Sequence, residues 1–417
     1  MQQILKFSSK WFKIIVFLFA THLAIMQSLQ QNKRSNMPQI PYIIRDKCAI
    51  TSDDDLEILI SKDYPIFCGC VSQDNIEQDI IATQTFAISK QYGVIQLKKL
   101  IPLDMLYQYG HDAGSVGNLW ESHHIEFSKF IIESTPKNVL EIGGGHSKLA
   151  LNCLQQKEIK WSIVEPNPTQ KDDSINYIES FFTKDVLLKD NYDTIIHSHT
   201  FEHIYDPHSF LADIASTMGG GGQMLFSIPN MQKWLENKWT NTLNFEHTIL
   251  LTENVVEYLL TKHSFKIHKK HYFGEHSIFY HVKYDKQLQN TKALQNEYQN
   301  NKALFLNMYN YYNKQIATLN VKLAQTNKVV YLFGAHLFSQ YLLYHGLCDT
   351  FIKAILDNNP NKHNKRLYGT TLLVYSPQIL TNIQNALVIL NAGAYNKEIE
   401  EQLYKINREV EIIVLDN

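Results

Sequence analysis

Cysteine is scarce in this sequence, with five residues scattered over 417 positions (Cys48, Cys68, Cys70, Cys153 and Cys348). An odd, small number of thiols argues against a disulfide framework and indicates a cytoplasmic protein with reduced thiols. An excess of one charge is also missing, because 39 basic and 41 acidic residues leave a formal net charge of −2. We therefore expect no nucleic acid as a bulk partner.

A long hydrophobic run is lacking as well. The most apolar stretch, WFKIIVFLFATHLAIM (11–26), contains Lys13 and His22 and is shorter than the roughly 20 apolar residues of a membrane span. Basic residues flank it, as in signal peptides and membrane anchors, but no small-residue cleavage site is evident. Residues 1–38 are predicted to be a hydrophobic extension. Whether 11–26 associate with the cytoplasmic face of a membrane or have no essential role is left open.

The sequence does contain enough apolar material for several cores. With 44% hydrophobic and 12% aromatic residues, a chain of 417 residues is globular and too long for one ordinary core. Residues 39–115 are predicted to form a small domain, and 116–285 a larger α/β domain. Residues 286–325 predict linker helices, and 326–417 a second α/β unit.

Within 116–285, patterns of strand and helix alternate. Strands are predicted at 138–142, 161–166, 192–199 and 222–230, and helices at 116–135, 147–156, 206–218 and 252–265. Thr252 is well placed to cap the last of these helices. Two further strands, KIHKKHYF and HSIFYHVKYD, are expected to pair antiparallel at the edge. The alternation predicts a doubly wound, mostly parallel sheet of the Rossmann-like kind.

The loop in VLEIGGGHSKLA (139–150) directly follows the first predicted strand and contains Gly143, Gly144 and Gly145. Ligands bind beyond the carboxyl ends of such strands. The dinucleotide fingerprint is incomplete, because Lys148 occupies the place of its third glycine, and the GK[ST] ending of a P-loop is missing. The loop therefore matches neither phosphate-binding motif.

Two acids complete a different kind of site. Glu141 lies in the strand that leads into the loop, and Glu165 ends the next strand. A carboxylate at the position of Glu165 can accept hydrogen bonds from both ribose hydroxyls. Glu141 would repel a pyrophosphate but would attract a sulfonium and an ammonium group. The pattern indicates S-adenosylmethionine (SAM) as cofactor.

The ordered pieces VLEIGGG, VEP, YDTIIHSHTFEHIYDP and GGGGQMLFSIPN resemble those of class I SAM-dependent methyltransferases. In that family, the position matched by Asp185 often holds the adenine amino group. The stretch NTLNFEHTILLT (241–252) and the C-terminal pieces VVYLFGAH and LNAGAYNKEI resemble C-methyltransferases that act on nucleotide-linked keto sugars. The resemblance covers about residues 40–417.

This resemblance implies a nucleotide sugar as substrate and assigns the acceptor site. Glu246 and His247 match the catalytic Glu-His pair, and His203 matches a second active-site histidine. A histidine titrates near neutrality and can remove the proton next to a ketone. Glu246 would orient His247. His111 matches a region that covers the sugar site, with an exposed turn histidine as the alternative.

Two departures from the family pattern are evident. Asn244 and Phe245 replace a tyrosine and a histidine, and an amide cannot act as an acidic hydroxyl. The family's zinc-binding N-terminal domain has two C-x-x-C pairs, whereas this chain has Cys48 with Thr51 and Ser89 with Tyr92. Structural zinc needs four ligands, so we predict a degenerate domain without metal. We also predict no metal at His197, His199, His203 and His208.

Two alternatives to a sugar C-methyltransferase stay open. One is an O- or N-methyltransferase that acts on a glycan, a lipid or another small molecule, which Asn244 and the degenerate zinc site favour. Asn244 is predicted to contact the substrate. The other is a catalytically silent protein that binds SAM or serves as a scaffold. The intact acids Glu141 and Glu165 argue against the second alternative.

Overall fold

The computed structural model describes residues 40–72, 75–108, 117–187, 190–218, 222–288 and 291–415. Residues Tyr42–Asn417 form one compact unit. The predicted extension 1–38, with its apolar stretch 11–26, and His111 lie outside the described residues. A search of the described part of the chain finds no helix with the length and hydropathy to span a membrane.

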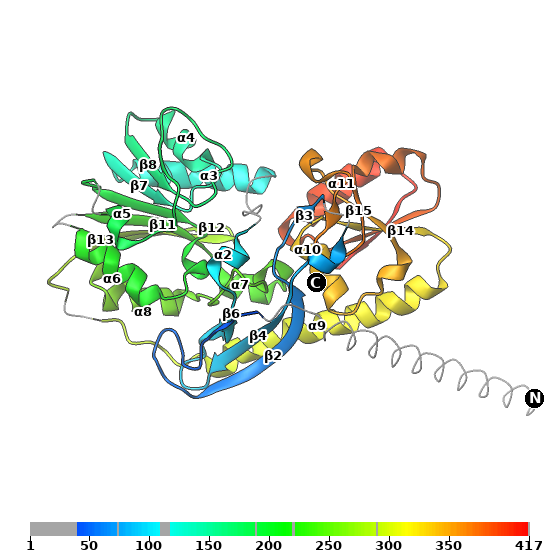
Figure 1. Cartoon of the computed structure of the whole chain (residues 1–417), viewed down its shortest axis with the longest axis horizontal. Coiled ribbons are helices and arrows are strands. Elements are labelled where there is room, and N and C mark those ends of the chain that lie inside the picture. Colours follow the sequence, from blue (N-terminus) through cyan, green and yellow to red (C-terminus); the bar gives the residue numbers. More distant parts are fainter. Residues whose placement is uncertain are drawn as a thin grey trace, which may run out of the picture. The chain divides into compact units, whose positions relative to one another are not determined.

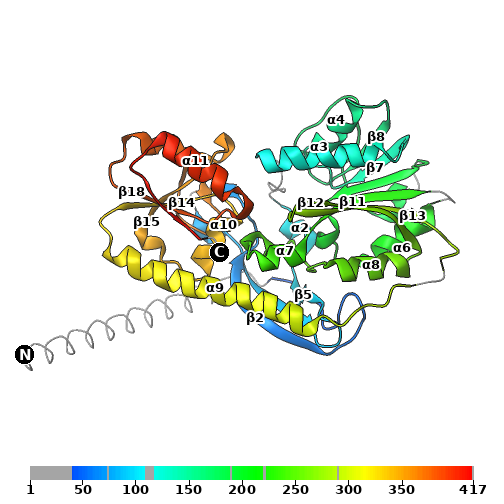
Figure 2. The ribbon, with the colours of Figure 1, turned by 180° about the vertical axis from the view of Figure 1, so that it is seen from behind.

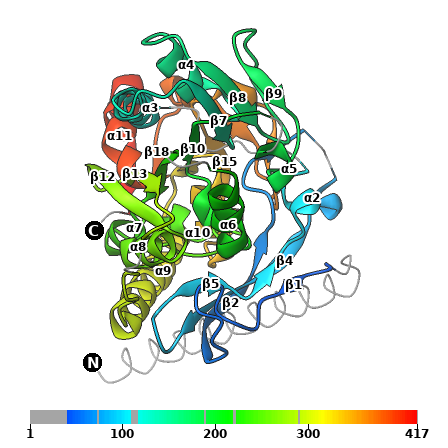
Figure 3. The same cartoon turned by 90° about the vertical axis from the view of Figure 1, so that its left-hand side faces the viewer.

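A seven-stranded sheet with the order β12-β13-β11-β10-β7-β8-β9 dominates the middle of the chain (Figure 1). Five strands run parallel: β7 (Asn138–Ile142), β8 (Lys160–Val164), β9 (Asn176–Ile178), β10 (Thr194–Ser198) and β11 (Gln223–Pro229). Strands β12 (Phe265–Phe273) and β13 (Ser277–Tyr284) join antiparallel at one edge (Figure 3). The predicted doubly wound fold with an antiparallel edge is confirmed.

Helices cover both faces of this sheet. Helices α3 (Asn118–Ile132) and α4 (Lys148–Leu154) pack on one face through residues such as Phe127 and Leu149. Helices α6 (Pro207–Thr217) and α8 (Glu253–Lys262) pack on the other face, where Leu140 and Ile142 of β7 point. Because β7 is buried on both faces, its fully buried side chains are apolar except for one, Glu141.

The two helix starts on the second face differ in their capping. Asp206 accepts hydrogen bonds from the backbone N–H groups of His208 (3.1 Å) and Ser209 (3.0 Å), which caps α6. Thr252 occupies the N-cap position of α8, as predicted, but its hydroxyl does not cap the helix. The hydroxyl donates instead to the carboxylate of Glu297 (3.3 Å). The predicted N-cap position of Thr252 is therefore confirmed, but its side chain does not cap the helix.

The C-terminal region contains a second sheet, in which five parallel strands have the order β17-β15-β14-β18-β19. The strands are β14 (Val329–Phe333), β15 (Ile352–Leu356), β17 (Val374–Tyr375), β18 (Ala386–Leu390) and β19 (Glu411–Val414), and its helices include α10 (Leu337–Tyr344) and α11 (Asn396–Ile406). The strand order reverses between β14 and β18. Such a switch point creates a crevice beyond the carboxyl ends of the strands.

The N-terminal region is built on an antiparallel sheet of β2 (Leu56–Pro65), β4 (Ile81–Ser89) and β5 (Ile95–Leu97). The predicted linker helices are one long helix, α9 (Tyr298–Gln325), shown in yellow in Figure 2. Its Phe305 packs against Phe86 of β4 with ring centroids 5.7 Å apart. Asp79 accepts two hydrogen bonds from Arg366, which ties this region to the C-terminal one.

Two of the four positions that the resemblance matches to zinc ligands, Thr51 and Ser89, contact one carboxylate. Asp53 accepts hydrogen bonds from the hydroxyls of Thr51 and Ser89, the latter at 3.1 Å. The carbonyl of Asp53 accepts from the backbone N–H of Cys48 (2.7 Å), and the hydroxyl of Ser89 accepts from the N–H of Tyr92 (3.3 Å). These residues do not fit a structural zinc site of four ligands. A hydrogen-bonded cluster around Asp53 joins the two chain segments.

Replacing Asp53 with alanine is expected to destabilise the protein by about 1–3 kcal/mol, because the two hydroxyls lose a charged acceptor. The midpoint of urea unfolding, followed by circular dichroism, measures this loss. Asp54→Ala is the matched control, because Asp54 is exposed beside the cluster. Equal midpoints for the two variants would contradict the proposed role of Asp53.

Candidate active site

A cavity of about 660 Å³ collects most of the residues predicted from the sequence. Its lining includes the glycine loop, both predicted cofactor acids, and residues beyond β14, β15 and β18 of the second sheet. The carboxyl ends of both parallel sheets therefore open into one space. The lining residues that the sequence predicted are Glu141, Gly143, Gly144, Gly145, Glu165, His203, Asn244, Glu246 and His247.

The loop between β7 and α4 leaves little room for a side chain at two of its three glycines, Gly143 and Gly144. Gly143 has a φ of +82°, and a Cβ atom there would lie 2.7 Å from Thr200 Oγ1. A Cβ atom on Gly144 would lie 2.7 Å from the carboxyl carbon of Glu141. Two glycines are thus required for the loop to approach both Thr200 and the acid, and the backbone forms one wall of the cavity.

Glu141 is a buried acid with 3% of its surface exposed. Burial raises the pKa of its carboxyl to about 7, while the hydrogen bond from Trp161 Nε1 (2.9 Å) opposes this rise and Glu165 adds to it. Glu165 follows β8, and its Oε1 accepts a hydrogen bond from the backbone N–H of Asn167 (3.0 Å). The two carboxylates flank the glycine loop.

His247 lies at the end of a tight turn in the opposite wall and is 7% exposed. Its Nδ1 is 3.0 Å from the carbonyl oxygen of Thr242. Because a carbonyl only accepts hydrogen bonds, this contact places a proton on Nδ1. The Asn244 side chain holds the turn, since its Oδ1 accepts from the N–H groups of Glu246 (2.8 Å) and His247 (2.9 Å).

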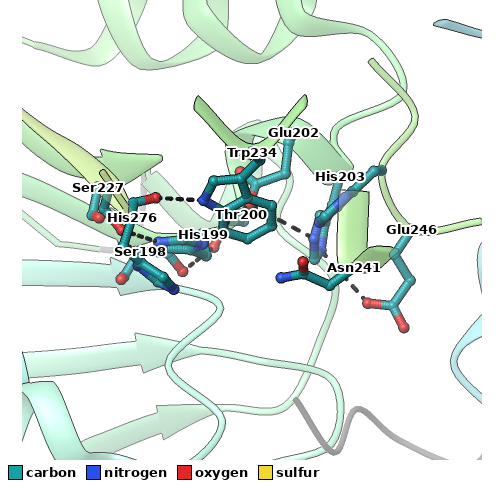
Figure 4. Close-up of polar contacts among 12 residues, drawn as sticks. Ser198, His199, Thr200, Glu202, His203, Ser227, Trp234, Asn241, Glu246 and His276 are labelled. Carbon is teal, nitrogen blue, oxygen red and sulfur yellow. Dashed lines mark hydrogen bonds and ion pairs between the residues drawn. The ribbon is translucent and has the colours of Figure 1, made fainter. Parts of the chain in front are cut away.

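His203 lies between two carboxylates (Figure 4). Its Nδ1 is 3.9 Å from Glu246 Oε2, and its Nε2 is 3.9 Å from Glu202 Oε1. The ring centroids of His203 and His247 are 5.4 Å apart. The sequence predicted Glu246 as the group that orients His247. In the structure a backbone carbonyl holds Nδ1 of His247, and the Glu246 carboxylate lies beside His203.

Two family profiles match the chain. A profile described as a methyltransferase domain matches residues 119–271, which include the glycine loop, Glu165, His203 and His247. A second, described as a C-methyltransferase C-terminal domain, matches residues 277–415. Residues 119–271 are therefore a methyltransferase domain, and residues 277–415 a C-methyltransferase C-terminal domain. The second profile begins within the antiparallel edge of the large sheet and includes α9, so this helix belongs to the matched region.

Solved structures similar to this methyltransferase share little sequence with it. They include an O-methyltransferase family protein from Burkholderia thailandensis, with 10% identity over 40% of this chain and 57% of that chain and a TM-score of 0.34. Another is the N-methyltransferase NodS from Bradyrhizobium japonicum, with 12% identity over 40% of this chain and 97% of that chain and a TM-score of 0.30. A third is a SAM-dependent methyltransferase from Aquifex aeolicus, with 14% identity over 38% of this chain and 90% of that chain and a TM-score of 0.31. The chain thus spans little more than half the length of the first, 57%. No curated protein matches the methyltransferase significantly.

The residues present fit SAM. The cofactor supplies a methyl group on a positively charged sulfur. Glu141 would attract the positive charges, the backbone of the glycine loop leaves space for the ligand, and Glu165 offers acceptors for ribose hydroxyls. Phe181 and Phe182 also line the cavity, and the sequence did not single them out. Their position directly before the predicted adenine ligand was the available signal.

The raised pKa of Glu141 predicts that SAM affinity depends on pH. A bound cation favours the carboxylate, so the dissociation constant should fall as the pH rises from about 6 to about 7.5 and the carboxyl loses its proton. Isothermal titration calorimetry over this range measures the slope. Glu141→Gln should bind more weakly and lose the dependence. A flat wild-type profile, or the same slope in the variant, would contradict this interpretation.

The structure does not bring every predicted residue to the methyltransferase site. Asp185 is exposed on α5 (Lys184–Leu187), a helix of one turn, and is not among the residues that line the cavity. Its match rested on position in the chain, whereas Phe181 and Phe182 of the loop before it do line the cavity. His111 lies outside the described residues. Both assignments stay predictions.

One group of three side chains could hold a metal ion. A ligand atom from each of Glu202, His203 and His247 lies within 4.8 Å of the others. Of the other histidines in the predicted cluster, His199 lies beside this group, with its Nδ1 3.6 Å from Glu202 Oε1, whereas His197 and His208 lie apart from it. His197 stacks on Phe226 in the core, with ring centroids 4.8 Å apart, and burial lowers its pKa to about 3. His208 Nδ1 lies 2.8 Å from His263 Nε2. The expected lack of a metal stays a prediction.

Proposed function

We propose that the enzyme methylates a carbon atom of a nucleotide-linked keto sugar, with His247 as the base. The observation that carries this proposal is the hydrogen bond from His247 Nδ1 to Thr242 inside the cavity, because it selects the tautomer in which Nε2 is the basic nitrogen. A neutral histidine with a fixed tautomer can accept a proton from a carbon next to a ketone. Methylation of an oxygen or nitrogen atom does not require the removal of a proton from carbon.

The second sheet supports a nucleotide as the carrier of the sugar. The cavity reaches the loops that follow β14 and β15, where Asp357 and Lys362 line it. Asp357 Oδ2 accepts from the backbone N–H of Ala335 (2.7 Å), and its Oδ1 accepts from the N–H of Asn359 (2.8 Å). A crevice at a strand-order switch is the usual place for a nucleotide in doubly wound folds. The match to a C-methyltransferase C-terminal domain agrees with this reading.

Each chain segment then has a role. Glu141, Glu165 and the glycine loop hold the cofactor, His247 removes the proton, and His203 contacts the sugar. The Glu246 carboxylate beside His203 favours the cationic form of that imidazole and so helps it to donate a hydrogen bond.

Transfer to a heteroatom is the second candidate. Asn244 favours it, because the tyrosine of the related C-methyltransferases is missing and the amide is occupied by the turn. An acceptor panel separates the two candidates. Residues 37–417 are incubated with SAM and with nucleotide-linked keto sugars or their reduced counterparts, and mass spectrometry reports the gain of a methyl group. Transfer only to keto sugars supports carbon methylation, whereas transfer to reduced sugars would exclude a required ketone.

A further inference from the structure

Carbon methylation requires a hydrogen-bond donor for the oxygen of the ketone. When the neighbouring proton leaves, negative charge develops on that oxygen, and a donor aimed at it accelerates the step. In the catalytic turn, the Asn244 side chain is engaged in hydrogen bonds to the backbone of the turn itself. The amide oxygen of Asn244 accepts from the backbone of Glu246 and His247, and its Nδ2 donates to the carbonyl of Asn241 (3.1 Å).

A phenol enters the same cavity from another element. Tyr107 follows α2 (Leu103–Leu106) in the N-terminal region and lines the cavity. Its hydroxyl is 3.5 Å from Nδ1 of His203. The ring packs near Phe181, with centroids 6.3 Å apart, and the Tyr107 carbonyl accepts from Asn167 Nδ2 (3.3 Å). These contacts hold the Tyr107 ring in the cavity, between Glu165 of the proposed cofactor site and the histidines of the proposed acceptor site, His203 and His247.

The surroundings of Tyr107 keep its hydroxyl protonated. Burial raises the pKa of the phenol well above its usual range, and the negative carboxylates of Glu246, Glu165 and Glu202 act in the same direction. A protonated phenol is a hydrogen-bond donor at neutral pH. The same environment makes Tyr107 unsuitable as the base and leaves that role to His247.

We infer that Tyr107 is a catalytic residue whose hydroxyl donates a hydrogen bond to the ketone oxygen of the acceptor during proton removal. This inference rests on the proposed function. The bond between the acceptor carbon and its hydrogen breaks, and the proton goes to Nε2 of His247. The electron pair forms a carbon–carbon double bond while the carbonyl π pair moves to oxygen, where the Tyr107 hydroxyl stabilises the charge. His203, within reach of the same hydroxyl, orients it.

The experiment isolates proton removal from methyl transfer. Full-length wild type and Tyr107→Phe are incubated in deuterated water with a nucleotide-linked keto sugar and S-adenosylhomocysteine, and NMR follows exchange of the proton next to the ketone. Loss of one donor should slow exchange, and kcat for methylation with SAM, by about 100-fold. Calorimetry should give the same affinity for SAM. Tyr344→Phe is the matched control, because its hydroxyl donates to the carbonyl of Gly369 (2.8 Å) and it does not line the cavity.

The outcomes separate this inference from the proposed function. Exchange by wild type that is slow in Tyr107→Phe and normal in Tyr344→Phe supports the role of Tyr107. Equal exchange in wild type and Tyr107→Phe overturns that role and leaves carbon methylation standing. A parallel loss of SAM affinity in Tyr107→Phe also overturns it, because the tyrosine would then be structural. Wild type that neither exchanges nor methylates keto sugars overturns the proposed function and this inference together.

Discussion

Replacing His247 with asparagine should lower kcat for methyl transfer about 1,000-fold without changing the affinity for SAM. The asparagine amide can still donate to the Thr242 carbonyl, which His247 Nδ1 contacts at 3.0 Å, so the turn keeps its structure. The variant has no counterpart of Nε2 to accept a proton. Steady-state kinetics with a keto sugar give kcat, and calorimetry gives the affinity for SAM.

His268→Asn is the matched control for this substitution. His268 is exposed on β12, at the edge of the large sheet, and should be replaced without loss of activity. If His247→Asn kept more than about a tenth of the wild-type kcat, proton abstraction by His247 would be excluded, since a missing general base costs at least about 100-fold.

Replacing Glu165 with glutamine should weaken SAM binding by about 10- to 100-fold, the cost of losing hydrogen bonds to a charged acceptor. Glutamine keeps the shape of the side chain but removes the negative carboxylate that would accept hydrogen bonds from the two ribose hydroxyls. Calorimetry with SAM and with S-adenosylhomocysteine measures the effect, which should be similar for both ligands because they share the ribose.

Glu179→Gln is the control for this second prediction. Glu179 follows β9 near the same edge of the sheet, where it pairs with Lys171 (2.5 Å), and both side chains are about half exposed (57% and 48%). Its loss should leave the affinity for SAM unchanged. An unchanged affinity in Glu165→Gln would instead show that Glu165 does not hold the cofactor.

The parallel part of the central sheet could be predicted because its longer strands each contain a short apolar run followed by a loop. The pattern is unambiguous for β7 and β11, which are almost fully buried. Strand β9, with three residues, is too short to produce a periodic signal. Helix α9 was predicted as a linker because polar residues dominate its composition. Its buried residues, such as Phe305 and Tyr312, pack against segments that are distant in the sequence.

The site could be predicted where a side chain acts through its own strand or loop, as for Glu141 and the glycines. The contacts of the turn that contains His247 could not be predicted, because they depend on the backbone geometry of the turn. Adjacency in sequence suggested that Glu246 orients His247, which stays a prediction, whereas the contact of His247 Nδ1 with the Thr242 carbonyl had no signal in the sequence. The proximity of Tyr107 to His203 depends on contacts across 96 positions and left no local signal.

The most direct measurement of the central claim is the position of the new methyl group. The enzyme is incubated with SAM that carries a ¹³C-labelled methyl group and with a nucleotide-linked keto sugar, and NMR identifies the atom to which the label is bound. We predict a methyl group on the carbon next to the ketone, formed by wild type and by His268→Asn but not by His247→Asn. A methyl group on oxygen or nitrogen, or a carbon-bound methyl group that forms equally fast in His247→Asn, would contradict the account.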